Sequence, residues 1–319
     1  MTMGPGGAGD RERETPPRPL ATTPAPGEPW TILRLVLWSA AYLKEKGVEQ
    51  GRLDAEHLLA HALGTGRLQL YLQHERPVAE DELARYKPLL RRRAAREPLQ
   101  YILGRTPFRE IDLGIDPRAL VPRPETEVLV DVVLEWARGR AGTEPTLSAA
   151  DVGTGSGCIA LSLAREGPFR RVVATDASPA ALELAGENAR RLGLEGRVEL
   201  RSGNLLEPLA GEHFDALVSN PPYVARGERT ALPPEVREWE PEEALFGGAD
   251  GLEVIRRLVG GAADHLAPGG LLALEVGLGQ SGAVTGLLDA TGAFESTGVR
   301  RDLTGRPRIV TARRRSYAS

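Results

Sequence analysis

A glycine-rich loop is the first group of residues whose types suit chemistry. Gly153, Gly155 and Gly157 alternate with Thr154 and Ser156 between a predicted strand and a predicted helix. Glycines let the backbone turn tightly and let a ligand approach its amides, and the N-terminus of the following helix supplies a partial positive charge. Such a loop is typical of sites for nucleotide-like cofactors, but on its own it also fits a purely structural turn.

A carboxylate downstream strengthens the cofactor hypothesis. Asp176 ends the next predicted strand, about 20 residues beyond the glycine loop, where an acid can accept hydrogen bonds from both ribose hydroxyls of an adenosine-containing ligand. Dinucleotide enzymes use almost the same device, so the loop alone does not choose the cofactor. In the dinucleotide pattern the third glycine follows the second by three residues, whereas Gly157 follows Gly155 by two. This shorter spacing is nearer to that of methyltransferase loops.

Contacts to an adenine ring are expected in the loop after the third predicted strand. Asn204 and Leu205 occupy that loop. The amide oxygen of Asn204 can accept a hydrogen bond from the amino group of adenine. We therefore add these two residues to the predicted cofactor site.

A second motif, Asn220-Pro221-Pro222-Tyr223, directly follows the predicted strand at residues 214–219. Ligands of α/β sheets bind beyond the carboxyl ends of strands, so this loop is placed to meet a substrate. An amide or amino nitrogen is a poor nucleophile because its lone pair is delocalised. The side-chain oxygen of Asn220 and the carbonyl oxygen of Pro221 can hold its two hydrogens, and Tyr223 offers a flat face to a planar group. The motif predicts catalysis at such a nitrogen.

The elements that must position these motifs follow an alternating pattern from residue 147 onward. Short β-rich segments at residues 149–152, 172–176, 198–200, 214–219, 271–276 and 309–311 alternate with helical segments that begin at Cys158, Pro179 and Leu252 and near Val284. This alternation predicts a mostly parallel sheet flanked by helices.

The rest of the chain divides by composition. Residues 1–29 are rich in Gly, Pro and Thr and have few bulky apolar side chains, so we expect a disordered tail. Apolar residues at helical spacing predict a small helical domain over residues 30–105, and a shorter period predicts a hairpin linker over residues 106–122. Residues 123–319 then form the sheet domain.

Composition also excludes several kinds of protein. The formal net charge of −4 gives no general attraction to nucleic acid phosphates. Cys158 is the only cysteine, which excludes an intramolecular disulfide, and it is expected to be a small packing residue. His57 and His61 share a helix face but lack a third ligand, so we predict no metal site. With no signal peptide or membrane span in view, the expectation is a soluble cytoplasmic protein.

Several stretches of the chain resemble those of a known family. The Asn-Pro-Pro-Tyr motif is shared by methyltransferases that act on adenine or on protein glutamine. Residues 96–104 and 120–127 look like signatures of the release factor N5-glutamine methyltransferases, and the resemblance covers residues 31 to 313. It implies a seven-stranded Rossmann-like domain, with the last strands antiparallel, that binds S-adenosylmethionine. The implied reaction is transfer of its methyl group to the side-chain amide nitrogen of a glutamine in peptide chain release factors.

The resemblance also implies roles for individual residues. The glycine loop from Gly153 to Gly157 and Asp176 bind the cofactor, Asn220 binds both cofactor and substrate, and the run to Tyr223 holds the target glutamine. One departure concerns the adenine loop, where relatives commonly have an acid at the position of Asn204 and some have a bulky aromatic residue next to it. A neutral amide loses charge assistance, so weaker cofactor binding is expected.

Several alternatives remain at this stage. The same chemistry on a ribosomal protein glutamine or on adenine in nucleic acid is one, a dinucleotide-dependent oxidoreductase is another, and a catalytically silent binding module is a third. The acidic net charge and the two signature stretches favour a protein substrate. We expect a monomer whose helical domain recognises the release factor, with no membrane and no direct nucleic acid contact.

Overall fold

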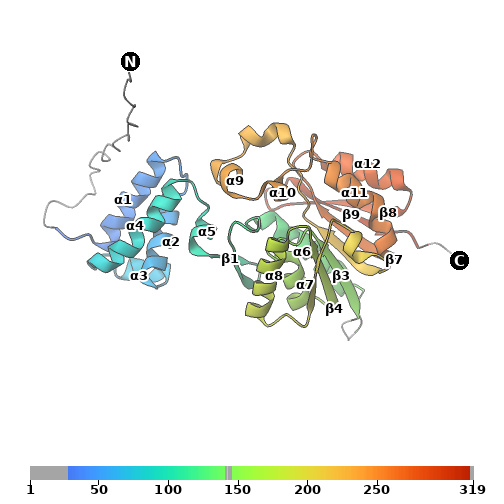
Figure 1. Ribbon diagram of the computed structural model, residues 1–319, viewed down its shortest axis with the longest axis horizontal. Coiled ribbons are helices and arrows are strands. Elements are labelled where there is room, and N and C mark those ends of the chain that lie inside the picture. The colour runs from blue at the N-terminus through green and yellow to red at the C-terminus, as the bar shows by residue number, and fades with distance from the viewer. Residues whose placement is uncertain (1–27, 141, 143–145, 317–319) are drawn as a thin grey trace, which may run out of the picture. The chain divides into compact units, whose positions relative to one another are not determined.

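The computed structural model describes residues 28–140, 142 and 146–316 (Figure 1). The chain divides into two compact units, Met1–Ala95 and Arg96–Ser319. The predicted disordered tail lies outside the described residues apart from Glu28 and Pro29. Within the described ranges, no helix has both the length and the apolar character needed to cross a membrane.

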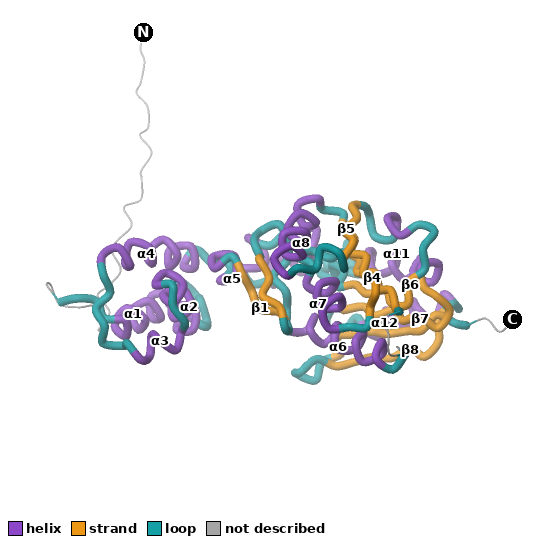
Figure 2. The backbone as a smooth tube through the Cα atoms, turned by 90° about the horizontal axis from the view of Figure 1, so that it is seen from below, coloured by secondary structure: helices purple, strands orange, loops and turns teal. Residues whose placement is uncertain are grey.

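The first unit is a bundle of helices, as the spacing of apolar residues predicts (Figure 2). Its helices are α1 (Ile32–Glu45), α2 (Gly51–Leu63), α3 (Arg67–Leu72) and α4 (Glu80–Ala94). The side chain of Thr31 accepts a hydrogen bond from the backbone N–H of Arg34 at 3.3 Å and caps α1. A Cβ at Gly51 would lie 2.8 Å from the carbonyl oxygen of Ala40, so glycine is what lets α1 and α2 approach closely.

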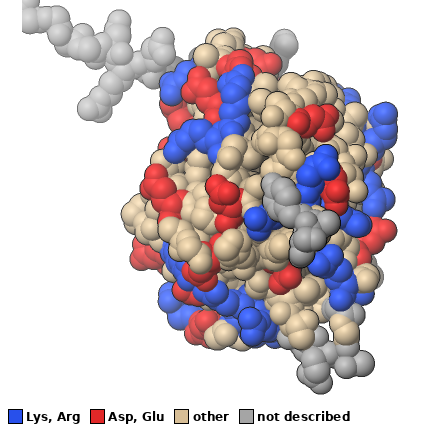
Figure 3. Space-filling model, turned by 90° about the vertical axis from the view of Figure 1, so that its right-hand side faces the viewer, with Lys and Arg blue, Asp and Glu red and all other residues tan. Residues whose placement is uncertain are grey.

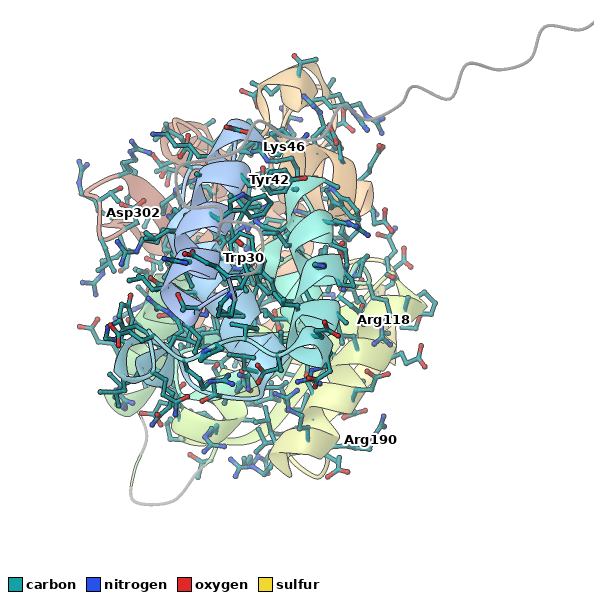
Figure 4. All side chains as sticks on the ribbon, turned by 90° about the vertical axis from the view of Figure 1, so that its left-hand side faces the viewer. Trp30, Tyr42, Lys46, Arg118, Arg190 and Asp302 are labelled. Carbon is teal, nitrogen blue, oxygen red and sulfur yellow. The ribbon has the colours of Figure 1, made fainter. Side chains whose placement is uncertain are left out.

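Polar and aromatic contacts add to this bundle. Arg93 on α4 donates to Asp54 on α2 at 2.7 Å, and both side chains are nearly buried. Along α1 the ring of Trp38 stacks on Tyr42 with 5.3 Å between centroids, and the ammonium of Lys46 lies 5.7 Å from the centre of the Tyr42 ring (Figure 4). The Arg93–Asp54 contact joins α4 to α2, whereas the aromatic contacts lie along α1 and its C-terminal end.

The second unit opens with the short helix α5 (Leu99–Leu103) and the antiparallel hairpin β1 (Arg105–Phe108) and β2 (Ile111–Gly114). A hairpin is therefore present near the predicted position, but it spans residues 105–114 rather than 106–122 and belongs to the second unit. Its apolar residues turn inward into the core of the unit, and its last residue is held by helix α8 (Pro179–Leu192). There the side chain of Asn188 accepts from the N–H of Gly114 at 2.7 Å and donates to its carbonyl oxygen at 3.0 Å.

A seven-stranded sheet forms the centre of this unit, with strand order β5-β4-β3-β6-β7-β9-β8. The strands are β3 (Leu147–Val152), β4 (Phe169–Asp176), β5 (Val198–Ser202), β6 (Phe214–Ser219), β7 (Leu266–Glu275), β8 (Phe294–Arg301) and β9 (Pro307–Arg314). Strands β3 to β7 pair in parallel, whereas β9 runs antiparallel to β7 and β8 antiparallel to β9. The expected Rossmann-like fold is confirmed.

Helices cover both faces of the sheet (Figure 1). The strand period of two sends Ala149 into the core with α6 (Pro124–Arg138) and α7 (Cys158–Glu166), and sends Ala150 into the opposite core. That second core is closed by α11 (Glu253–Ala262) and α12 (Ser281–Thr291). Burial on both faces explains why the central strands read as continuous apolar runs.

Shorter elements connect these layers. They are the 3-10 helices η1 (Glu207–Leu209), η2 (Arg226–Ala231) and η3 (Ala263–His265) and the short helices α9 (Pro234–Trp239) and α10 (Glu242–Leu245). Three of them, η2, α9 and α10, follow one another between β6 and α11. They lie downstream of the Asn-Pro-Pro-Tyr motif and so are placed to line a site there.

We expect the core around β4 to dominate the stability of the second unit. Phe169 is completely buried, so Phe169→Ala should lower the free energy of unfolding by about 3–5 kcal/mol, because it removes apolar contacts and leaves a cavity. Urea unfolding followed by circular dichroism measures this loss. Leu303 is 91% exposed and serves as the control, with a change within about 0.5 kcal/mol on substitution by alanine. A loss below about 1 kcal/mol for the Phe169 variant would contradict the assigned core.

Candidate active site

A cavity lies at the carboxyl ends of β3, β4 and β6. The predicted site residues that line it are Gly153, Thr154, Gly155, Ser156, Asp176, Asn204, Leu205, Asn220 and Pro222. The other predicted site residues, Gly157, Pro221 and Tyr223, are not among the described residues of its wall. The fold thus brings the glycine loop and the Asn-Pro-Pro-Tyr loop to a single cavity.

The glycine loop after β3 has a backbone that glycine suits best. Gly153, Gly155 and Gly157 have φ angles of 75°, 55° and 84°, in the left-handed region that other residues rarely adopt. The N–H groups of Gly153 and Thr154 both donate to the carbonyl oxygen of Thr175 on β4, at 2.8 and 2.9 Å. Gly157 precedes the first residue of α7, so its part in this structure is to begin that helix.

Asp176 binds the glycine loop as well as facing the cavity. Its carboxylate accepts from the N–H of Gly155 and from the N–H of Ser178, each at 2.9 Å. Each carboxylate oxygen has a further lone pair, so the group is still able to accept hydrogen bonds from a ligand. Asp176 therefore joins the loop after β3 to the loop after β4 at the cavity wall.

A second acid, Asp151, lies beneath the loop and was not assigned a role from sequence. It is fully buried, and one of its oxygens accepts from the hydroxyl of Thr154 at 2.6 Å and from the N–H of Ala160 at 3.1 Å. Burial raises the pKa of Asp151 to about 7. It links the loop to the first turns of α7, and its place at the start of the glycine motif was the signal that could have identified it.

The adenine loop predicted from sequence also reaches the cavity through Asn204 and Leu205. Leu205 has a φ of 52°, a left-handed conformation that is uncommon for a residue with a branched side chain. Its carbonyl oxygen accepts from the hydroxyl of Thr175 at 3.4 Å, which ties the loop to β4. Backbone strain of this kind concentrates at binding sites, where the surrounding structure holds it in place.

The side chain of Asn220 is hydrogen-bonded to a residue of α6. Its side-chain N–H donates to the hydroxyl oxygen of Thr126 at 3.1 Å, and the Thr126 hydroxyl donates to Glu275 at 2.7 Å. Thr126 stands in the first turn of α6 and lines the cavity beside Asn220. Sequence reasoning placed Thr126 in a signature stretch without giving it a function.

Glu275 accepts a second hydrogen bond on its other carboxylate oxygen. The hydroxyl of Tyr223 donates it at 3.3 Å, so the same acid contacts both Thr126 and Tyr223. Burial raises the pKa of Glu275 to about 7 and raises the pKa of Tyr223 above its ordinary value. Glu275 is the last residue of β7, and its position in an apolar strand gave no sign of this contact.

The segment of η2, α9 and α10, residues 226–245, forms another wall of the cavity through Pro241, Glu243 and Ala244. Two arginines hold it. Arg96 donates two hydrogen bonds to Glu235 at 2.7 and 2.6 Å, and Arg123 donates to both oxygens of the buried Glu240 at 2.8 and 2.6 Å. Both arginines belong to the two stretches that resemble family signatures.

Cys158 behaves as the packing residue expected from sequence. It is buried at the cavity wall, and burial raises the pKa of its thiol to about 12, which keeps the sulfur protonated. Over the part of the chain that the structure describes, no three His, Cys, Asp or Glu side chains are grouped as a metal site would require. The cavity is lined by apolar side chains together with the amides of Asn204 and Asn220, the carboxylates of Asp176 and Glu243, and the guanidinium groups of Arg118 and Arg257.

Comparison with known proteins gives two matching family models. The PrmC N-terminal domain matches residues 34–104, and the methyltransferase small domain matches residues 139–233. Among solved structures, the hMettl16 catalytic domain superimposes with a TM-score of 0.51 at 16% identity, over 65% of this chain and 76% of that one. At this identity the likeness concerns the fold alone.

Curated relatives are similar over nearly their whole length. The release factor glutamine methyltransferase of Geobacter sulfurreducens is 45% identical over 286 residues, which are 90% of this chain and 98% of that protein. The protein of the same name from Moorella thermoacetica is 48% identical over 269 residues, which are 84% of this chain and 93% of that protein. The chain belongs to the release factor glutamine methyltransferase family.

Proposed function

We propose that this protein transfers a methyl group from S-adenosylmethionine to the side-chain amide nitrogen, N5, of a glutamine in peptide chain release factors. The observation that carries the proposal is the orientation of Asn220. Thr126 holds the N–H end of its amide, which leaves the amide oxygen as an acceptor in the cavity that the glycine loop also lines. The proposal includes a cytoplasmic location, where release factors act.

The residues of the cavity fit this cofactor. A Cβ at Gly153 would meet no heavy atom within 4 Å, so a ligand has room to approach the backbone of the loop. We assign Asp176 to the ribose hydroxyls and Asn204 and Leu205 to adenine; all three line the same cavity as Asn220. When bound, the sulfonium supplies a methyl group that is already activated for transfer.

The chain's own part in the reaction is to hold and aim the acceptor nitrogen. The oxygen of Asn220 accepts one N–H of the target amide. The motif assigns the other N–H to the carbonyl oxygen of Pro221, a buried residue of the same loop that is not in the described cavity wall. Together they draw electron density toward the nitrogen and fix its direction of approach. Fixed orientation of two reactants supplies a large part of the acceleration in such reactions.

A protein substrate is favoured over adenine in nucleic acid. The net charge of −4 opposes general binding to phosphates, and acidic and basic side chains are interspersed over the face shown in Figure 3. Both curated relatives compared above carry the name release factor glutamine methyltransferase, which also supports release factors over a ribosomal protein. We further propose that the protein acts as a monomer.

The helical domain is proposed to recognise the release factor. It contributes a surface that the cofactor site does not need, and on α3 the apolar side chains of Leu68, Tyr71 and Leu72 are exposed. Exposed apolar residues grouped on one short helix are typical of a surface that binds a protein.

Incubation of the protein with S-adenosylmethionine and purified release factors, followed by mass spectrometry, tests the proposed function. A gain of one methyl group on a glutamine side chain is expected. Methylation of adenine in nucleic acid, with unmodified release factors, would favour the alternative substrate.

Asp176→Ala should weaken cofactor binding by about 1.5–3 kcal/mol, because charge-assisted hydrogen bonds to the ribose are lost. Calorimetric titration with S-adenosylhomocysteine measures the change. Asp176→Asn is the matched control. It keeps the shape and one acceptor oxygen, although its NH2 group then faces one of the two backbone N–H groups, and it should bind more tightly than the alanine variant. Unchanged affinity in a folded Asp176→Ala protein would remove this residue from the site.

Asn220→Ala should slow methyl transfer by about a hundredfold, because a target nitrogen displaced by about 1 Å loses its alignment. Asn220→Asp keeps an acceptor of similar shape but adds a charge, so its rate should lie between those of the alanine variant and the unaltered protein. Single-turnover measurements with saturating cofactor and release factor report these rates. An alanine variant within a factor of about two of the unaltered protein would contradict the proposed role.

A protein that begins at Arg96 should keep its affinity for S-adenosylhomocysteine and lose activity on intact release factor, because recognition is assigned to the helical domain. Circular dichroism checks that the shortened protein is folded, and calorimetry and single-turnover rates report the two functions. Full activity on intact factor would show that the helical domain is not needed for recognition.

A further inference from the structure

We infer that Glu275 is a positioning residue, whose buried carboxylate fixes the orientation of the Asn220 amide through the hydroxyl of Thr126. The inference rests on the proposed function, because it concerns how Asn220 presents an acceptor to the nitrogen that is methylated. Glu275 itself does not line the cavity. It acts through residues that do.

Side chains from separate elements meet at this carboxylate. Thr126 comes from the first turn of α6, Tyr223 from the loop after β6, and Glu275 from the end of β7. Thr126 donates to one carboxylate oxygen at 2.7 Å and Tyr223 to the other at 3.3 Å. Thr126 and Glu275 are 2% and 1% exposed, so little water is available to replace either contact.

The count of hydrogens decides which way the Asn220 amide points. A threonine hydroxyl has one hydrogen, and Thr126 gives it to Glu275. Toward Asn220 its oxygen is then an acceptor alone, so the N–H end of the amide must face it, as the 3.1 Å contact shows. The amide oxygen is left for the cavity, where it can accept from a substrate N–H.

Without the Glu275 carboxylate, the direction of the hydrogen bond between Thr126 and Asn220 is no longer fixed. The Thr126 hydroxyl could then donate to the oxygen of Asn220, and the amide would turn its own N–H groups toward the substrate. Two N–H groups facing each other repel, so the target nitrogen would be displaced from its line of approach. A buried acid at the end of β7 thus selects the one amide orientation that suits the reaction.

The cost of burying this acid supports a role beyond packing. An isolated carboxylate in an apolar interior is strongly disfavoured, and an apolar side chain of equal volume would fill the site at lower cost. Two hydroxyls and the charge of Arg308 on β9 favour the ionised form, whereas Glu125 on α6 opposes it. The structure therefore retains an acid here at some expense, one hydroxyl away from the residue that receives the substrate.

The test combines Thr126→Val, which keeps the shape and removes the hydroxyl, with Glu275→Met, which keeps the volume and removes the carboxylate. Each change should lower the single-turnover rate by about a hundredfold, the effect of a misplaced reactant. Affinity for S-adenosylhomocysteine, measured by calorimetry, should fall far less than the rate, because Asn220 is only one of the residues assigned to the cofactor. Because both changes break one relay, the double variant should be no slower than the slower single variant.

Two further variants separate positioning from folding. Thr126→Ser restores the hydroxyl in a smaller side chain and should recover at least about a third of the original rate, although it packs less well than valine. Thr311→Val on β9 removes a hydroxyl that donates to a backbone carbonyl at 3.5 Å, and it controls for the loss of a threonine hydroxyl elsewhere in the second unit. Thermal unfolding of every variant accompanies the rates.

The outcomes are distinct. Rate losses that multiply in the double variant, a serine variant as slow as the valine variant, or losses of cofactor affinity in step with the rates would overturn the inference. Should Glu275→Met fail to fold, the comparison of valine with serine at position 126 still decides. An unaltered protein that does not methylate release factor overturns the proposed function and this inference with it. An active protein whose rate is insensitive to both changes overturns the inference alone.

Discussion

The pairing of β3 with β4 on one side and β6 on the other is the constraint on which the site depends. Parallel strands end at the same edge of a sheet, and the chain reverses its strand order at β3. The loops that leave β3, β4 and β6 are therefore gathered over one opening. The glycine loop, Asp176 and Asn220 meet there because of this topology, although none of them is near another in sequence. Remote apolar contacts on both sheet faces thus decide where the polar chemistry takes place.

Sequence alone predicted the parts of this fold that local patterns determine. The parallel strands are apolar runs, the helices from Cys158 and Pro179 begin where their first residues indicate, and the hairpin shows a period of two. Strand β8 was not predicted, because most of its residues from Phe294 to Arg301 are polar or partly exposed. Most of the buried side chains of this pair belong to its partner β9, so the pairing could not be recognised from either segment alone.

The site shows the same division between local and remote information. The two loops could be predicted because glycine spacing and the Asn-Pro-Pro-Tyr motif are continuous in sequence. Thr126 and Glu275 could not be assigned, because what each one does depends on a partner that is distant in sequence. Asp151 differs, since it starts the glycine motif and contacts residues within it and shortly after it. Glu275 is the clearest case, since its contacts come from α6 and from the loop after β6. Tyr223 was expected to offer the face of its ring to the substrate, and the sequence did not indicate that its hydroxyl contacts that acid.

The arginine contacts to the segment of residues 226–245 have a consequence for the entropy of substrate binding. A long surface connection that orders only when its ligand arrives loses conformational freedom at that moment, and this loss subtracts from affinity. Arg96 and Arg123 already hold the segment through paired hydrogen bonds to Glu235 and Glu240. Its freedom is thus surrendered during folding. Contacts with an incoming polypeptide then need not offset the ordering of this segment, and their free energy can distinguish the correct partner from others.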